Sequence, residues 1–214
     1  MNRRVISLTI GLTFLAITTA IVVLASRAAY ESAAYTVVEK DGNFEIRDYD
    51  DLMLVATDTN IDAQGRDGSF MRLFRYISGD NQRKEKIAMT TPVFMEESGQ
   101  DQQGTMAFVM PKDLSDNGVP GPIGEGVQVK TREGGRFAVI RFSGQLNSES
   151  ATRNQQLLRE WIEQRQLVGE PFSESAGYDP PYTPGPLRRN EVLIRLRSST
   201  TPSVKESIPS SGAN

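Results

Sequence analysis

One order of elements occurs twice along the body of this chain, and it constrains the fold more than any other feature. Over residues 35–110 and again over 127–197, strand-like segments rich in β-branched and aromatic residues flank a single amphipathic helix. In each half a strand, at 52–60 or 136–143, leads through a short loop into that helix. This order predicts an α+β domain in which two similar halves close one largely antiparallel sheet.

Each half is predicted to contain one helix. The first covers residues 65–78, and its apolar face consists of four side chains at three- or four-residue spacing: Phe70, Leu73, Phe74 and Ile77. The second runs from about Glu149 to Leu167, with Ser148 as the predicted N-cap. An apolar face of this kind usually packs on a core, but it can also line a ligand site.

Turn residues predict two hairpins. Asp41-Gly42 would join strands at 35–40 and 44–50, and Glu133-Gly134-Gly135 would join strands at 127–131 and 136–143. Further strands are predicted at 52–60, 86–96, 105–110 and 191–197. Residues 111–126, rich in Pro and Gly, are predicted to form a loop.

Two residue types are missing from the whole chain. The 214 residues contain no Cys and no His, which excludes Cys-ligated zinc, iron–sulfur clusters, the zincin helix and Ser-His-Asp triads. The net charge is −3, and residues 1–29 hold three Arg and no acid, so the body is more acidic than the chain as a whole. An acidic body argues against a nucleic-acid partner, since proteins that bind nucleic acids usually present a basic face.

Residues 1–29 are predicted to be a membrane segment. After Arg3 and Arg4, the 21 residues Val5–Ala25 carry no charge, and as a helix they would span roughly 31 Å, enough to cross a bilayer. The favoured interpretation is an uncleaved anchor. The alternatives are a secretory signal cleaved near Ser26-Arg27-Ala28, after which the protein would be secreted, and a buried helix. Anchor and signal both leave the body extracytoplasmic, which means periplasmic in a Gram-negative bacterium.

The predicted organisation therefore has three parts. Residues 1–29 are the N-terminal membrane anchor or signal segment, and 30–197 are the folded domain. Residues 198–214, rich in Ser and Thr with two Pro, are predicted to be a disordered tail.

Five short motifs along the body resemble the SOUL haem-binding protein family. In chain order they are Tyr76-Ile77-Ser78-Gly79-Asp80-Asn81, Lys86-Ile87-Ala88-Met89-Thr90-Thr91-Pro92-Val93, Phe108-Val109-Met110-Pro111, Tyr178-Asp179-Pro180-Pro181 and Arg188-Arg189-Asn190-Glu191-Val192. The similarity spans about Tyr35 to Leu196. It implies a distorted, antiparallel-rich β-barrel of two pseudo-symmetric βαββ-like halves with two main helices. It also implies tetrapyrrole binding in a surface groove beside the first helix.

The resemblance further implies which residues contact the porphyrin. The family's apolar ring-facing positions fall on Phe70 and Phe74, and its basic position before the helix-terminal Tyr falls on Arg75. A porphyrin needs apolar contacts for its ring and cations for its two propionates. The predicted haem-binding residues are accordingly Arg66, Phe70, Met71, Phe74, Arg75, Met89 and Arg188. The alternative is that the apolar residues are core and the arginines are solvated.

Iron ligation is less defined than the groove. Some family members use a His ligand, which this chain lacks, so unligated or five-coordinate haem, held non-covalently by stacking and Arg–propionate pairs, is expected. Met89 is a weak candidate ligand, and Tyr76 and Lys86 are the others.

These observations predict a non-catalytic, membrane-tethered protein that binds b-type haem or another porphyrin and serves haem transport or buffering. An alternative is a small-molecule effector-binding or protein-interaction module on the same fold, because the fold looks like the effector-binding domains of some bacterial transcription regulators. An enzyme built on paired carboxylates is a third interpretation, but the sequence pairs none of its acids.

The N-terminal segment generates the first prediction. The full-length protein should fractionate with membranes and resist high-salt extraction, because an uncharged helix is held by the hydrocarbon core rather than by ionic contacts. Deletion of residues 1–29 should release the protein into the soluble fraction. Fractionation with immunoblotting checks both, and recovery of uncleaved full-length protein in the cytosol would contradict the prediction.

Overall fold

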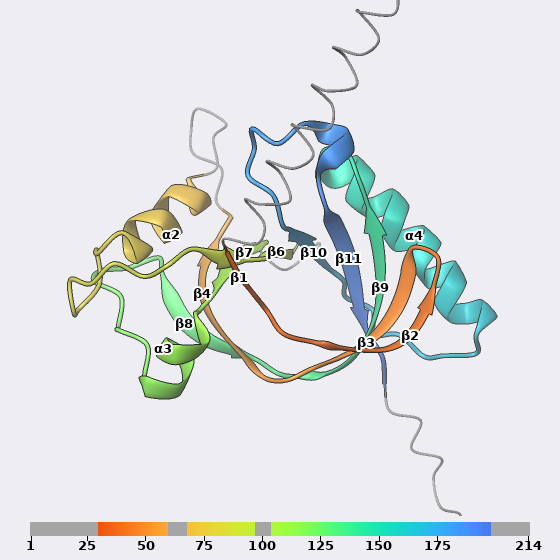
Figure 1. The fold of residues 1–214 in the computed structure, drawn as a ribbon, viewed down its shortest axis with the longest axis horizontal. Helices are drawn as coiled ribbons and strands as arrows, with labels where there is room; N and C mark the ends of the chain where they lie inside the picture. Colours follow the sequence, from red (N-terminus) through yellow and green to blue (C-terminus); the bar gives the residue numbers. More distant parts are fainter. Residues whose placement is uncertain (1–29, 60–67, 97–103, 198–214) are drawn as a thin grey trace, which may run out of the picture.

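The computed structural model describes residues 30–59, 68–96 and 104–197 (Figure 1). The predicted membrane segment and the predicted tail lie outside these residues, as does Arg66. Within the described part, no helix has both the length and the apolarity needed to span a membrane.

The described residues form a curled nine-stranded sheet in the order β2-β3-β9-β11-β10-β6-β7-β4-β8 (Figure 1). All neighbouring strands are antiparallel. Their bounds are β2 Thr36–Asp41, β3 Phe44–Tyr49, β4 Leu52–Asp58, β6 Val93–Glu96, β7 Thr105–Val109, β8 Gln128–Arg132, β9 Gly135–Phe142, β10 Glu174–Gly177 and β11 Asn190–Arg195. Two short strands, β1 (Glu31–Ser32) and β5 (Thr90–Thr91), pair separately and in parallel.

Two main helices accompany the sheet, α2 (Ser69–Ile77) and α4 (Ser148–Gln164). The predicted N-cap of α4 is wrong by one residue. Asn147 caps it, because its side chain accepts from the Ser150 N–H at 2.9 Å while the Ser150 hydroxyl accepts from the Asn147 N–H at 3.0 Å. A short helix, α3 (Lys112–Asn117), and a 3₁₀ turn, η1 (Gly185–Leu187), are the remaining helical elements of the described residues. The segment predicted as one loop over 111–126 thus contains α3.

Two equivalent halves build this sheet, and the predicted α+β fold is confirmed. The first half is β3-β4-α2-β6-β7 and the second is β8-β9-α4-β10-β11. In each half the strand before the helix pairs with the last strand, as β4·β7 or β9·β11. The halves meet where β6 pairs with β10. The first strand of each half pairs with the other half, as β3·β9 and β8·β4.

The predicted hairpin at Asp41-Gly42 is confirmed by the pairing of β2 with β3. The predicted hairpin at residues 133–135 is wrong, because the two halves exchange their first strands. β8 and β9 follow one another but pair with different strands. Gly134, which lies between them, serves a close approach instead of a hairpin turn. A Cβ at Gly134 would lie 2.5 Å from the Tyr49 carbonyl oxygen, and the Gly134 N–H donates to the Asp51 carboxylate at 2.7 Å. The β3–β4 connection and the β8–β9 connection are therefore in direct contact.

Strand register places α2 and α4 on the same face of the sheet, which we call the helix face. Leu73, Tyr76 and Ile77 of α2 pack in one cluster with Val55 and Phe108. Leu158, Trp161 and Ile162 of α4 pack in another cluster with strand residues that include Ile140 and Val192. In register, Phe108 is opposite Val93, which is opposite Gly177. The helix face therefore continues across the central strands β6 and β10, from the cluster under α2 to the cluster under α4.

The opposite face of the sheet holds a buried ion pair. Arg47 is 1% exposed and Glu191 is fully buried, and they are joined by two hydrogen bonds of 2.7 and 2.9 Å. The Tyr178 hydroxyl donates to Glu191 at 2.9 Å, and Arg189 donates to it at 2.7 Å. Burial opposes ionisation of Glu191, but the hydrogen bonds and charges of both arginines outweigh burial and lower its pKa.

Replacing one member of this pair should be costly. Glu191→Gln should lower the free energy of unfolding by about 3–5 kcal/mol, because the buried Arg47 keeps only its pair with Glu45 and Arg189 loses its carboxylate partner. The matched control is Asp48→Asn, which breaks the exposed two-point pair between Asp48 and Arg136 and should cost at most about 1 kcal/mol. Urea denaturation measures both, and equal losses would contradict a special role for the buried pair.

The same variants predict a pH dependence. A carboxyl group whose pKa is lowered by folding contributes stability above its unfolded pKa, near 4.5 for Glu, and this contribution is lost as the pH falls through the lower folded value. The stability difference between the wild type and Glu191→Gln should therefore be constant above about pH 5 and shrink at more acidic pH. Urea midpoints across this range test it, and a difference that grows on acidification would refute it.

Candidate functional site: an apolar groove beside helix α2

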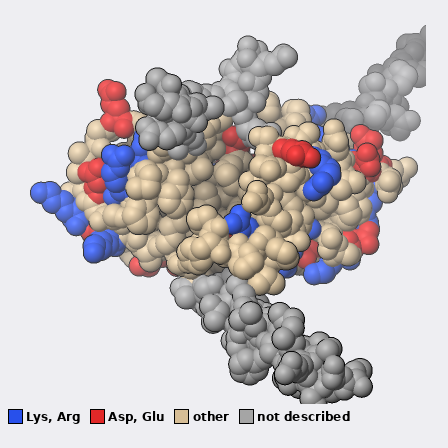
Figure 2. All heavy atoms as spheres, turned by 90° about the horizontal axis from the view of Figure 1, so that it is seen from above, with Lys and Arg blue, Asp and Glu red and all other residues tan. Residues whose placement is uncertain are grey.

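A groove of about 360 Å³ opens on the helix face where the two halves meet. Its floor includes Val93 of β6 and Gly177 of β10, which are register partners. Its other lining residues are Tyr30, Phe70, Phe74, Met89, Thr90, Thr91, Tyr178, Asp179, Pro180, Pro181 and Tyr182. In the space-filling view, uncharged surface occupies most of the middle of the molecule, and most Lys and Arg side chains lie towards its ends (Figure 2).

Helix α2 divides its predicted apolar face between core and groove. Leu73 and Ile77 are buried against the sheet, whereas Phe70 is 39% and Phe74 is 44% exposed, and both line the groove. Their rings stack at 6.1 Å between centroids and 12° between planes, and Phe70 also meets Phe108 edge-on. Residues four apart share one side of a helix, so the two rings form a continuous apolar wall.

Two of the predicted haem-binding residues on α2 lie outside the groove lining. Met71 and Arg75 are both exposed, and Arg75 lies in the last turn of the helix, directly after Phe74. A neighbouring arginine, Arg72, is occupied, because its Nε donates to the Thr57 hydroxyl at 2.9 Å and so ties α2 to β4. Of the predicted set, Phe70, Phe74 and Met89 are thus brought together in the groove.

Arg188 does not line the groove, but it contacts the loop that forms one of its walls. Its guanidinium donates to the Thr183 carbonyl oxygen at 2.8 Å and also to the Pro181 carbonyl oxygen. The side chain therefore holds the loop after β10 by its backbone. None of the described residues that line the groove is Lys or Arg.

Of the predicted iron ligands, Tyr76 and Lys86 are absent from the groove. The Tyr76 hydroxyl is buried and donates to the Pro120 carbonyl oxygen at 2.6 Å, and burial raises the pKa of Tyr76 to about 12. Lys86 is exposed and does not line the groove. Met89 lines it and also packs against the α2 core cluster. No group of acidic side chains suited to hold a metal ion occurs among the described residues.

Two of the recognised motifs shape the backbone around the groove. Asn81 is fully buried, and its side-chain amide donates to the Tyr76 and Glu85 carbonyl oxygens at 3.0 and 2.8 Å, which secures the end of α2. The Tyr178-Asp179-Pro180-Pro181 motif supplies one wall of the groove. The motif is recognisable in the sequence, but the sequence-based prediction placed none of its residues, nor Tyr182, in the site.

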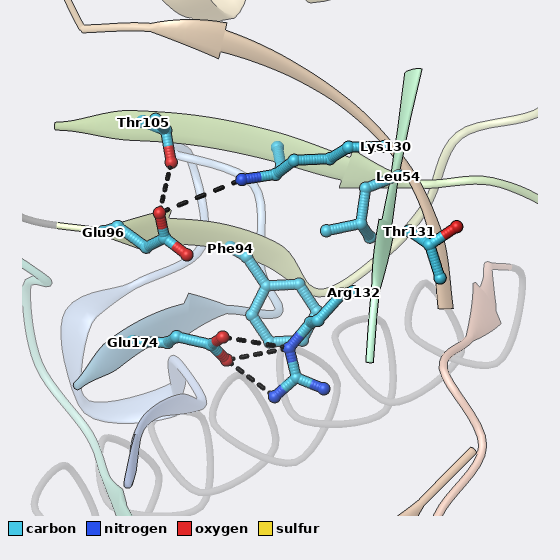
Figure 3. A pocket seen from close by; sticks show the side chains of 9 residues that line it. Leu54, Phe94, Glu96, Thr105, Lys130, Thr131, Arg132 and Glu174 are labelled. Carbon is cyan, nitrogen blue, oxygen red and sulfur yellow. Dashed lines mark hydrogen bonds and ion pairs between the residues drawn. The ribbon is translucent and has the colours of Figure 1, made fainter. Parts of the chain in front are cut away.

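A second, smaller pocket of about 140 Å³ lies elsewhere on the sheet and is lined by paired charges (Figure 3). Arg132 makes a two-point contact with Glu174 at 2.6 and 2.9 Å and lies over the Phe137 ring. Lys130 faces Glu96 at 3.9 Å. These two pairs leave the lining without net charge, and the pocket contains none of the predicted site residues.

Known proteins are similar to this chain in sequence. The chain matches the family model described as SOUL heme-binding protein over residues 30–195. Heme-binding protein 1 of Xenopus laevis is 26% identical over 162 residues, which cover 72% of this chain and 84% of that protein. Heme-binding protein 1 of Bos taurus is 26% identical over 142 residues, which cover 64% and 73%.

A solved structure is similar in fold. The crystal structure of a hydrolase from Listeria innocua has a TM-score of 0.54 and 10% sequence identity, and the match covers 75% of this chain and 94% of that one. At this identity the likeness concerns the fold alone. The family model, in contrast, spans most of the chain and confirms the resemblance carried by the five motifs. The chain belongs to the SOUL heme-binding protein family.

Proposed function

We propose that the protein binds haem or a related tetrapyrrole non-covalently in the groove beside α2, without catalysing a reaction. The stacked, half-exposed pair of Phe70 and Phe74 carries this proposal. Two large apolar rings that face an open groove gain stability when a flat apolar molecule covers them. Membership of the SOUL family and the names of the two curated relatives support the same ligand class.

The lining also suggests how the macrocycle is oriented. Because no Lys or Arg is found among the described lining residues, the propionates would remain at the rim, with an apolar edge of the ring innermost. Arg75, exposed and next to Phe74 in sequence, is the described arginine that we propose for a propionate. Arg66 lies outside the described residues and stays a candidate. For Arg188 we propose a positioning role in place of propionate contact, since its donors face two backbone carbonyls.

The groove would act by holding and partly desolvating one face of the ring. When bound, the porphyrin would supply whatever iron chemistry the complex has. Phe70, Phe74 and the prolines of the 178–182 wall would exclude water from the buried face. A site that is open on one side permits exchange of its ligand, which suits reversible haem transport or buffering. We place this activity outside the cytoplasm on the basis of the N-terminal segment.

The same lining favours a second candidate function. A groove without a lining Lys or Arg among the described residues also suits an uncharged aromatic molecule, as expected for an effector-binding module. Haem and such a ligand would compete for the two phenylalanines.

Alanine variants of these two residues test the proposal. Phe70→Ala and Phe74→Ala should each cost about 1–2 kcal/mol of stability, because half-exposed rings bury little area, and should weaken hemin binding by at least about tenfold. Absorption titration of the purified full-length protein with hemin, alongside urea denaturation, measures both effects.

A matched control distinguishes the groove from general loss of apolar surface. Leu157 on α4 is 44% exposed, as Phe74 is, but does not line the groove. Leu157→Ala should leave hemin affinity unchanged. Well-folded Phe70→Ala and Phe74→Ala proteins that bind hemin as the wild type does would remove the groove from the site, and a wild type that shows no spectral change with hemin would favour the effector-binding alternative.

A further inference from the structure

The loop after β10 presents an exposed tyrosine at the groove. Tyr182 is 77% exposed and yet belongs to the groove lining. No described residue forms a hydrogen bond with its hydroxyl. An aromatic ring in this position contributes little to the stability of the fold, because most of its surface remains in water.

The backbone of this exposed residue is nevertheless held on both sides. Arg188 donates to the carbonyl oxygens of Pro181 and Thr183, the two residues that flank Tyr182. The Thr183 N–H donates to the Pro180 carbonyl oxygen at 3.0 Å, which closes a turn around Tyr182. A guanidinium that makes two contacts with one loop restricts where that loop places its side chain. The structure thus pre-positions a phenol at the edge of the groove.

Few side chains of this groove have atoms that ligate haem iron. The chain contains no His and no Cys, so the described lining holds two other established types of haem ligand, the Met89 thioether and the hydroxyls of Tyr30, Tyr178 and Tyr182. The Asp179 carboxylate also lines the groove, but it accepts from the Arg189 N–H at 2.6 Å. The Tyr178 hydroxyl is committed to Glu191 at 2.9 Å and is buried. Met89 packs against the α2 core cluster. Of the two remaining tyrosines, Tyr182 is the one whose backbone is clamped by Arg188.

We propose that the phenol of Tyr182 is the iron ligand of ferric haem bound in this groove, an inference that rests on the proposed function. A tyrosine oxygen is an established type of protein ligand for haem iron. As the iron–oxygen bond forms, the phenol proton passes to solvent, a water molecule leaves the iron, and the iron remains ferric. Arg188 is then a positioning residue, which acts through the loop and not on the ligand.

The test compares hemin with metal-free protoporphyrin on the full-length protein. Protoporphyrin offers the same ring and propionates but no iron, so Tyr182→Phe should leave its affinity unchanged. The same variant should lower hemin affinity by about tenfold and abolish the iron–phenolate vibrations in the resonance Raman spectrum of the wild-type hemin complex. Tyr30→Phe removes the other candidate hydroxyl and should leave the iron–phenolate vibrations of the hemin complex in place.

The outcomes separate this inference from the function it rests on. Iron–phenolate vibrations that persist in Tyr182→Phe, or that vanish in Tyr30→Phe, would overturn ligation by Tyr182. Wild-type protein that binds hemin and protoporphyrin with equal affinity and shows no such vibrations would also overturn it, while leaving porphyrin binding intact. Failure of both porphyrins to bind the wild type would instead refute the proposed function.

Discussion

The buried pairing of Arg47 with Glu191 links the sheet to the candidate site. It joins β3 to β11 across the intervening strand β9. The same carboxylate accepts from Tyr178, directly after β10, and from Arg189, whose guanidinium stacks on the Tyr178 ring at 3.8 Å. The Arg189 N–H in turn donates to Asp179 at 2.6 Å. One wall of the groove is therefore anchored to the most buried charges of the described structure, and it can remain ordered although its outer residues face water.

The position of the groove follows from the internal symmetry of the fold. Each half packs its own helix on its own strands, so the central pair β6–β10 lies between the two helix clusters. Gly177 contributes no side chain there, and Val93 contributes a small one. The short helix α2 then turns Phe70 and Phe74 towards this strip while Leu73 and Ile77 seal it to the sheet. A two-fold arrangement of helices on one sheet thus leaves a hollow at its centre, and the loop after β10 adds one of its walls.

Much of the scaffold was predictable because it depends on local pattern. The spacing of apolar residues located both helices, and Asp41-Gly42 located the hairpin of β2 and β3. The strand predicted from residue 86 begins as regular pairing only at Thr90 and is divided at Pro92, which has no N–H to donate. The turn signal at 133–135 was misleading, because Gly134 is required by the close passage of the β3–β4 connection and not by a hairpin.

The sequence by itself determined the fold class, the family and the absence of His and Cys ligands, since each follows from residue identity and local order. Only the tertiary structure decided which edge of the α2 face stays open, because a three- and four-residue spacing defines an apolar stripe but not how much of it the sheet covers. It likewise decided that β8 and β9 separate and that Arg188 serves the Tyr182 loop. Strand partners and side-chain contacts of this kind join residues far apart in the chain or across a loop, and they arise only when the two halves pack together.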